Sequence, residues 1–166
     1  SREDAMAKNH LVLIEPEIPY NTGNIARTCV VTGSALHLVR PFGFRLTSRQ
    51  IERSGMDYWD NVDLTIWNSW QEFAAFADEK ERTGTQVLYV ETRTPRSLGD
   101  LAAMDEVMMV FGSESSGLPH AMMDAHPERL LRIPMLPGQR SLNLSNSAAI
   151  VLYEVLRQQG YAGLTQ

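Results

Sequence analysis

The sequence predicts an α/β fold in which a parallel sheet is covered by helices on both faces. Three observations support this fold class. Short apolar runs alternate along the chain with segments of helical periodicity. Loops rich in glycine and proline follow the apolar runs. The length of 166 residues suffices for one hydrophobic core but not for two ordinary domains. We therefore expect one domain over residues 10–166, preceded by a polar tail, residues 1–9, that is disordered or derived from a vector.

Six segments have the length and composition of buried strands. In a parallel sheet the carboxyl ends of the strands meet at one edge, and ligands bind outside that edge. We therefore expect the functional residues in the loops that follow the strands. The predicted strands are residues 10–15, 35–40, 62–67, 86–91, 106–111 and 130–133.

The first helix is predicted to run to Thr32, with Asn21 or Thr22 as its N-cap and Gly33 ending it in the left-handed conformation. At 100° per residue, one face of this helix is apolar and the opposite face carries Arg27. We expect the apolar face to pack on the sheet and Arg27 to point away from it. The residues of the apolar face are Ile25, Ala26, Cys29 and Val30.

Capping residues predict the later helices. Thr47 with Gln50 opens a short helix that Gly55 ends, and Ser69 with Glu72 opens a longer one that stops before Gly84. The last helix is expected over residues 145–159, with Ser145 as the favoured N-cap. Its core face comprises Ala148, Val151, Leu152, Val155 and Leu156, while Ile150 and Tyr153 lie on the opposite face.

The composition indicates a globular intracellular protein. Apolar residues make up 43% of the chain, and no apolar run approaches the roughly 20 residues of a membrane span. The single cysteine suits a reducing, cytoplasmic compartment. The net charge of −5 argues weakly against a general nucleic-acid binder, but residues 21–56 hold five arginines against one glutamate. Arginine is well suited to binding phosphate, so a local basic surface remains compatible with the acidic total.

Several common chemistries are disfavoured by the loops. Residues 111–119 read FGSESSGLP, which lacks the Lys and Ser/Thr of a P-loop and the second glycine of a nucleophile elbow. No G-x-G-x-x-G segment follows a strand. The four histidines and one cysteine have no zinc-ligand spacing, so we expect no metal and interpret His120 and His126 as surface residues.

Three segments together carry a family resemblance. They are NTGNIART (21–28), FGSESSGLP (111–119) and IPMLPGQRSLNLSNSAAIVLYE (133–154). In this order, and at strand ends, they resemble the three motifs of SPOUT RNA methyltransferases, more narrowly the TrmH-related branch that methylates ribose 2′-hydroxyls. The opening EPEIPYNTGNIART is most similar to members acting on the tRNA wobble nucleotide. The resemblance implies an S-adenosylmethionine cofactor, a C-terminal trefoil knot, a homodimer that completes the active site, and an anticodon stem–loop of tRNA as substrate.

The resemblance also implies site residues. The cofactor pocket would use Val90, Gly112, Ile133, Ser141 and Leu142, since glycine permits close approach of the backbone and apolar side chains can enclose adenine. The catalytic residues would be Arg27, Glu114 and Asn143. For Glu114 two interpretations stay open: a fixed negative group near the sulfonium or a partner arginine, and an acceptor that holds a loop or caps a helix. The RNA-binding residues would be Arg49, Arg53, Arg140 and Tyr153.

The specific role of Arg27 is a separate hypothesis. An arginine is a poor base because its pKa lies above about 12, so we expect Arg27 to bind a phosphate and to stabilise the developing alkoxide. Three functions compete with wobble methylation. They are ribose methylation elsewhere in tRNA or in ribosomal RNA, a catalytically silent RNA-binding or cofactor-sensing module, and an unrelated α/β hydrolase or nucleotide binder.

Overall fold

The computed structural model describes residues 8–44 and 59–166. A six-stranded sheet lies at its centre, in the order β3-β2-β1-β5-β4-β6, and every pair of neighbours is parallel. The predicted parallel α/β sheet and all six predicted strands are thus confirmed, each strand being slightly shorter than expected. The strands are β1 (His10–Ile14), β2 (Ala35–Val39), β3 (Leu64–Trp67), β4 (Gln86–Val90), β5 (Val107–Phe111) and β6 (Leu130–Leu131).

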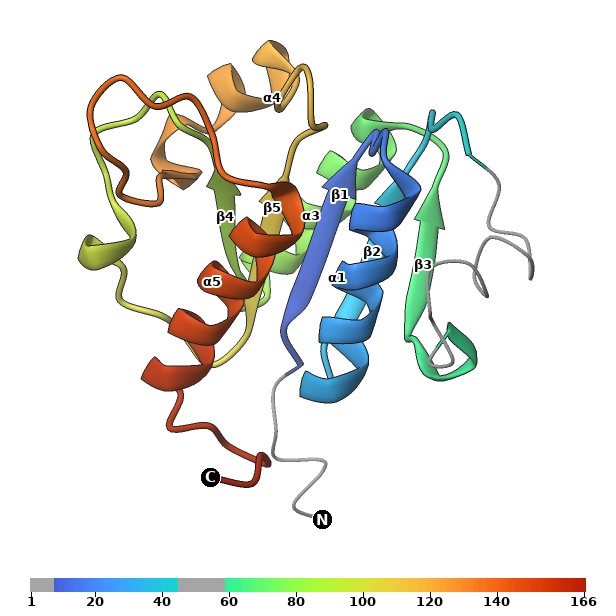
Figure 1. Cartoon of the computed structure of the whole chain (residues 1–166), viewed down its shortest axis with the longest axis vertical. Coiled ribbons are helices and arrows are strands. Elements are labelled where there is room, and N and C mark those ends of the chain that lie inside the picture. The colour runs from blue at the N-terminus through green and yellow to red at the C-terminus, as the bar shows by residue number, and fades with distance from the viewer. Residues whose placement is uncertain (1–7, 45–58) are drawn as a thin grey trace.

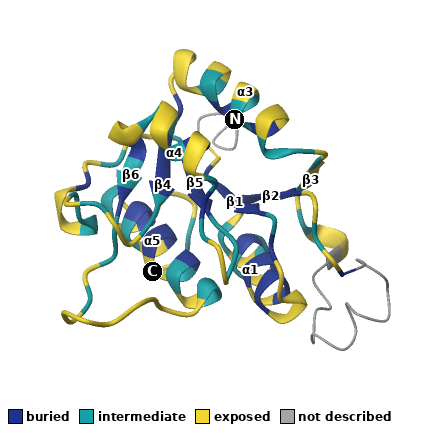
Figure 2. Cartoon of the chain, turned by 90° about the horizontal axis from the view of Figure 1, so that it is seen from above, coloured by how far each residue is buried: buried dark blue, intermediate teal, exposed yellow. Residues whose placement is uncertain are grey.

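Helices cover both faces of the sheet, as predicted. Helices α1 and α5 lie side by side on one face, and α3 lies on the other (Figures 1 and 2). Helix α4 stands near the carboxyl ends of the strands (Figure 1). The helices are α1 (Pro19–Thr32), α3 (Trp70–Arg82), α4 (His120–Ala125) and α5 (Leu144–Gln158), with short 3-10 turns η1 (Trp59–Asn61), η2 (Leu98–Asp100) and η3 (Pro127–Arg129).

Two apolar clusters, one on each face of the sheet, form the core (Figure 2). The cluster under α1 and α5 includes every residue of the predicted core face of α5. It also contains Cys29, which is fully buried, and burial raises the pKa of this thiol to about 12. The opposite cluster packs Phe73 and Ala77 of α3 against β1, β4 and β5. The helical periodicity therefore identified the buried face of α5 correctly, and for α1 three of its four predicted residues, since Val30 is only partly buried.

The start of α1 differs from the prediction. The helix begins at Pro19, and its N-cap residue, Ile18, makes no side-chain capping bond. Asn21 and Thr22, the predicted caps, lie inside the helix and are buried. Proline at the first position suits a helix start because its missing N–H would have had no partner there. The end of the helix at Gly33, with φ +69°, is as predicted.

The start of α5 also differs. Asn143, not Ser145, is the N-cap: its side-chain oxygen accepts hydrogen bonds from the backbone N–H of Ser145 (2.9 Å) and Asn146 (3.2 Å). For α3 the predicted N-cap is confirmed, since Ser69 Oγ accepts from the N–H of Glu72 at 3.1 Å. The helix predicted from Thr47 to Gly55 lies outside the described residues.

The predicted tail is shorter than residues 1–9. Asn9 is buried, and its side-chain oxygen accepts from the N–H of Val107 at 3.1 Å. The side-chain amides of Asn9 and Gln159 exchange two hydrogen bonds of 2.8 and 3.0 Å. Lys8 pairs with Asp63 at 2.8 Å. Residues 8 and 9 are therefore integrated into the domain, and residues 1–7 lie outside the described part of the chain.

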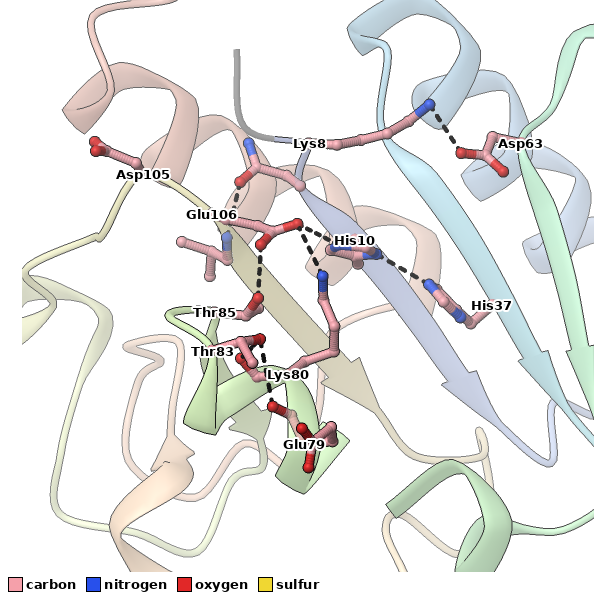
Figure 3. A network of polar contacts seen from close by, with 12 residues as sticks. Lys8, His10, His37, Asp63, Glu79, Lys80, Thr83, Thr85, Asp105 and Glu106 are labelled. Atoms are coloured by element: carbon pink, nitrogen blue, oxygen red, sulfur yellow. Dashed lines mark hydrogen bonds and ion pairs between the residues drawn. The ribbon is translucent and has the colours of Figure 1, made fainter. Parts of the chain in front are cut away.

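A chain of hydrogen bonds runs from Trp67, at the carboxyl end of β3, to His10 and Glu106 at the amino ends of β1 and β5, and Figure 3 shows its part from His37 to Glu106. The indole N–H of Trp67 donates to His37 Nδ1 (3.0 Å), His37 Nε2 bonds to His10 Nδ1 (3.0 Å), and His10 Nε2 bonds to Glu106 (3.0 Å). The groups at the two ends determine the direction of donation: Trp67 can only donate and the Glu106 carboxylate can only accept. Both neutral histidines therefore carry their proton on Nε2. We call these four residues the amino-end chain.

No helix among residues 8–44 and 59–166 combines the length and the hydropathy that crossing a membrane requires.

Candidate active site

A cleft of about 900 Å³ opens at the carboxyl ends of β4, β5 and β6. Its walls are the loops that follow these strands, together with the start of α1 and residues of α4 and α5. All five residues predicted to bind a cofactor line it, so the structure brings them together: Val90, Gly112, Ile133, Ser141 and Leu142. Glu114, Asn143 and Arg140 line the same cleft.

The loop after β5 is closed on itself. Ser113 and Gly117 exchange backbone hydrogen bonds of 3.3 and 3.0 Å, and the N–H of Ser116 donates to Ser113 Oγ at 3.1 Å. A Cβ at Gly112 would lie 2.0 Å from the backbone carbon of Gly117 and 2.2 Å from the nitrogen of Leu118. Only glycine fits at position 112, because the opposing backbone belongs to the same tight loop and has no free direction in which to move.

Glu114 reaches from this loop to the start of α1. Its carboxylate accepts from the N–H of Glu17 (2.9 Å), the N–H of Ile18 (2.8 Å) and Asn21 Nδ2 (3.1 Å). A negative group at this place also interacts favourably with the positive end of the helix dipole. Of the two interpretations of Glu114, the contacts found are therefore those of a carboxylate that holds a loop against a helix end.

Glu17, just before α1, makes the reverse contact to the loop after β5. Its carboxylate accepts from both the backbone N–H (3.0 Å) and the hydroxyl of Ser115 (2.5 Å), and the hydroxyl, followed by the N–H, lowers the pKa of Glu17. Each loop thus supplies a carboxylate to donors of the other loop. We call this reciprocal pairing of residues 17–18 with residues 114–115 the carboxyl-end clasp.

Asn21 extends this connection to α5. While its Nδ2 donates to Glu114, its Oδ1 accepts from Asn143 Nδ2 at 3.2 Å. Asn143 in turn caps α5 through its own oxygen. One residue from each of the three motif segments therefore takes part in a continuous series of hydrogen bonds, which fixes α1 relative to two walls of the cleft.

Two other predicted residues lie on the exposed faces of the paired helices. Arg27 is exposed, in the third turn of α1, as the periodicity predicted. Tyr153 on α5 is 46% exposed. Neither residue lines the cleft of its own chain. Arg140 is exposed at the rim of the cleft, and Arg49 and Arg53 lie outside the described residues.

The cleft has the composition of a site for an organic cofactor with a positive group. Apolar side chains of Val90, Ile133 and Leu142 line it, together with the carboxylates of Glu91 and Asp124. Gly112, also in the lining, allows the loop after β5 to close against its own backbone beside the cleft. These features fit a flat heterocycle joined to a cation. Among the described residues, no group of three His, Cys, Asp or Glu is arranged to hold a metal ion.

Three residues with structural roles were not found by the sequence analysis. Asn21 was interpreted as a cap, and Glu17 was not singled out. Arg129 is 2% exposed and binds Asp78 (2.9 Å), Glu81 (3.0 Å) and the Tyr89 hydroxyl (2.7 Å), which ties η3 and the start of β6 to α3 and β4. Each role depends on partners distant in sequence. The only available signals were the position of Asn21 in a motif segment and that of Glu17 in the opening EPEIPYNTGNIART.

Comparison with known proteins agrees with this geometry. Residues 8–153 match the SpoU rRNA Methylase family. The chain belongs to this family. The match covers most of the sequence and confirms the resemblance drawn from the three motif segments. The family assignment also makes an unrelated α/β hydrolase or nucleotide binder untenable.

Individual family members are similar over nearly the whole chain. The tRNA (cytidine(34)-2′-O)-methyltransferase of Aeromonas hydrophila is 43% identical over 157 residues, covering 94% of this chain and 97% of its own. A solved structure described as giving structural insights into the 2-OH methylation of C/U34 on tRNA is 39% identical, with a TM-score of 0.83 and coverage of 93% and 98%.

The fold also matches a more distant family member. The SpoU methyltransferase AviRb from Streptomyces viridochromogenes, solved in complex with the cofactor AdoMet, has a TM-score of 0.80 at 20% identity. The alignment covers 93% of this chain and 58% of AviRb. At this identity the similarity establishes the fold.

Proposed function

We propose that this protein transfers a methyl group from S-adenosylmethionine to the ribose 2′-hydroxyl of the tRNA wobble nucleotide, a cytidine or uridine at position 34. The observation that carries the proposal is the cleft itself, where all five predicted cofactor residues meet beside the clasp that holds α1. The high identity to a family member named for this reaction supports the choice of substrate. Because the proposed substrate is a tRNA, we place the enzyme in the cytoplasm.

In this proposal the cleft residues bind and orient the methyl donor. Val90, Ile133 and Leu142 enclose the adenine, and Ser141 supplies a polar group beside them. Bound S-adenosylmethionine supplies an electrophilic methyl group on a sulfonium. Because methyl transfer is an in-line displacement, the protein accelerates it mainly by alignment. The series Glu114–Asn21–Asn143 contributes to that alignment, since it fixes α1, which carries Arg27, to the cleft loops within each subunit, and the subunit contact then sets Arg27 against the cleft of the partner.

Arg27 is the catalytic residue of this proposal. A guanidinium stays protonated at neutral pH, so Arg27 binds the phosphate next to the target ribose and stabilises the alkoxide that develops on its 2′-oxygen. We assign Glu114 and Asn143 as positioning residues, because their polar atoms are engaged by α1 and α5. Asn21 joins them in that role.

The proposal includes a homodimer, since Arg27 does not line the cleft of its own chain. Exposed apolar side chains on α1 and α5 support a subunit contact there: Tyr20, Val31, Ile150 and Tyr153. The resulting active site would combine the cleft of one subunit with Arg27 and Tyr153 of the other. The trefoil knot implied by the family resemblance belongs to the same proposal, with the loop over residues 132–143 passing through the knotted region. Arg140 and the arginines at positions 49 and 53 would bind the tRNA backbone.

Methyl transfer from radiolabelled S-adenosylmethionine to total RNA tests the proposal. We expect label in tRNA, at a 2′-O-methylated nucleotide 34 when the modified position is mapped. Label in ribosomal RNA alone would instead support the function named in the family description. Label at another tRNA position would show that the methylated nucleotide is not nucleotide 34. A protein that binds the cofactor without labelling either RNA would be a silent module.

The role of Arg27 is tested by Arg27→Lys, which retains the charge but loses the planar pair of donors. We expect a loss of at least tenfold in kcat, with an unchanged melting temperature because the side chain is exposed. The measurement is single-turnover methylation at several pH values. Full activity with an unchanged pH profile would exclude the bidentate role, and Lys80→Arg on α3 serves as the control for exchanging the two cations.

A further inference from the structure

A second cavity, of about 540 Å³, lies beside the cofactor cleft at the same edge of the sheet. Its walls come from the loops after β1, β2 and β5 and from the start of α4. The loop after β5 separates the two spaces, and six of its residues and neighbours line both: Ser113, Ser115, Ser116, Gly117, Leu118 and His120. A group bound in the second cavity is therefore separated from the methyl donor by one loop.

Glu15 lines this cavity in an unusual backbone conformation. It directly follows β1 and has φ +52°, in the left-handed region that a non-glycine residue rarely adopts because its side chain is strained there. Its N–H donates to the carbonyl of Val39 at 2.9 Å, which fixes the strained residue to the end of β2. Strain of this kind persists where the surrounding structure enforces it, and it is concentrated at functional sites.

The carboxylate of Glu15 is available to a ligand. Within residues 8–44 and 59–166 it takes part in no hydrogen bond or ion pair, and the side chain is only partly exposed. The neighbouring Glu17 lines the same cavity, but its carboxylate is occupied by Ser115. The fold therefore holds one unpaired, partly buried acceptor at the cavity wall, where it favours a ligand with N–H donors.

The remaining walls suit a flat, partly apolar group. Three proline rings and the side chains of Ile14 and Leu118 line the cavity, and serine hydroxyls add polar contacts. Phe42 contributes at the rim, with Phe44 stacked on its ring at 5.0 Å and the guanidinium of Arg40 over it at 5.7 Å. Arg40 is exposed and provides a cation for a phosphate next to the bound group. The prolines are Pro16, Pro41 and Pro119.

We propose that this cavity binds a nucleobase of the RNA substrate that neighbours the methylated nucleotide, through an exocyclic amino group that donates to Glu15. This inference rests on the proposed function and adds to it a contact that selects sequence. Carboxylates recognise bases in this way, as when Glu or Asp accepts from the N4 amino group of cytosine. A base displaced from the stack of a single-stranded loop can be bound by such an edge contact. The base pocket then holds a part of the RNA next to the ribose that receives the methyl group from the cofactor in the cleft.

The test compares RNA affinities of variants at position 15. The RNA is an anticodon stem–loop with cytidine at position 34, and its binding is measured by fluorescence anisotropy at one fixed salt concentration. We expect Glu15→Gly to weaken binding about tenfold, the loss of one hydrogen bond to a charged group. Because glycine accepts the left-handed conformation, the melting temperature should not fall, which separates this loss from misfolding. Glu15→Asp, which keeps a carboxylate, should have intermediate affinity. Glu79→Gln, an exposed charge change on α3, is the control for net charge.

The RNA side of the contact identifies the base. Each base flanking nucleotide 34 is replaced in turn by an analogue without its exocyclic amino group, such as purine for adenine or inosine for guanosine. At one position the replacement should weaken binding to the wild-type protein about tenfold and leave binding to Glu15→Gly unchanged.

Two results would overturn the inference. The first is equal affinity of wild type and Glu15→Gly for the unmodified stem–loop. The second is weaker binding of S-adenosylmethionine by Glu15→Gly, which would assign the cavity to the cofactor. Methylation of the same stem–loop by wild type is measured in parallel. If wild type methylates the stem–loop and the Glu15 variants bind it with normal affinity, only the base pocket is refuted. If wild type does not methylate the stem–loop, the proposed function itself is refuted.

Discussion

The two ends of the sheet carry two polar networks of different construction. The amino-end chain joins neighbouring strands through buried rings, with His10 8% and His37 4% exposed (Figure 3). The carboxyl-end clasp joins loops, and Glu17, Ser115 and Ile18 are exposed. The bond between the two histidines is buried and those to Trp67 and Glu106 are partly buried, whereas the bonds of the clasp are exposed and compete with water. We infer that the amino-end chain mainly stabilises the sheet, while the clasp mainly positions parts of the active site.

This difference explains why polar residues at the two ends should respond differently to substitution. Removing a partner from a buried network leaves a polar group without water and costs about 1–3 kcal/mol. Removing an exposed bond costs little stability because water replaces the partner. A small displacement of a helix that carries a catalytic group can nevertheless reduce the rate about 100-fold. Substitutions in the amino-end chain should therefore lower mainly stability, and substitutions in the clasp mainly activity.

The largest effect is expected for Glu114→Gln. The amide keeps one acceptor oxygen but directs its N–H₂ toward the donors of α1, so at least one of the three bonds from Glu17, Ile18 and Asn21 is lost. We expect kcat for methylation to fall about 10- to 100-fold, with a much smaller change in melting temperature. Rate measurements on Glu154→Gln, a half-buried carboxylate on α5 that binds Arg157 and Gln158, give the control. Equal losses in both variants would refute the positioning role.

Substitution of Asn143 separates its two functions. Asn143→Asp keeps the oxygen that caps α5 but loses the N–H₂ that donates to Asn21, whereas Asn143→Ala loses both. We expect alanine to lower the free energy of unfolding by about 1 kcal/mol and aspartate to preserve it. Both variants should lose activity, by about tenfold. Urea unfolding with parallel rate measurements checks this. Wild-type activity of Asn143→Asp would show that the bond to Asn21 has no part in the reaction.

At the amino end the expected effect is on stability and depends on pH. Burial, and then the neighbouring His10, lowers the pKa of His37 to about 4 from the ordinary 6.5. The unfolded state thus binds more protons between these values, so the folded state should be most stable above pH 6.5 and lose stability as the pH falls toward 4. The charged groups around His37 are Asp63, which opposes the shift, and Lys80, which adds to it.

Urea unfolding of wild type and His37→Gln between pH 7 and 4.5 measures this dependence. One titrating group contributes at most about 1.4 kcal/mol per pH unit, and we expect His37→Gln to lose much of that slope. Above pH 6.5 the kcat of His37→Gln should equal that of wild type, because His37 does not line the cleft at the carboxyl ends of the strands. Identical slopes for the two proteins would contradict the assignment to His37.

The smallest effect is expected for Glu17→Gln. Its carboxylate is exposed, and the amide oxygen can still accept one of the two Ser115 bonds. We expect activity to change by less than threefold and the melting temperature to stay constant at pH 7. Because the Glu17 pKa is lowered, its contribution is present above pH 4.5 and is lost as the pH falls below that value. A loss comparable to that of Glu114→Gln would mean that the two halves of the clasp act as one unit.

Much of the fold could be predicted because its signals are local. Apolar runs located all six strands, and the periodicity of α5 identified its five buried residues. The two helix starts were misplaced because their caps depend on distant residues. The donors at the start of α1 bind Glu114, which is 96 residues away from Ile18, and Asn143, the N-cap of α5, also donates to Asn21, 122 residues away.

The residues that line the cleft could be predicted better than the hydrogen bonds that hold its walls together. The family resemblance predicted five residues for the cofactor pocket, and these five line one cleft. The contacts that hold the cleft together could not be inferred, since Glu17 and Asn21 acquire partners only when β1 and β5 lie side by side. The burial of Arg129 had no local signal either, because its partners come from α3 and β4.

The burial of the single cysteine has a practical consequence. Cys29 is inaccessible, and its raised pKa keeps it in the unreactive thiol form at neutral pH. A cysteine introduced on an exposed face of α1 or α5 would therefore react alone with maleimide dyes or spin labels, in the otherwise natural sequence. The fold thus offers a chemically silent background on which spectroscopy can measure distances across the proposed subunit contact.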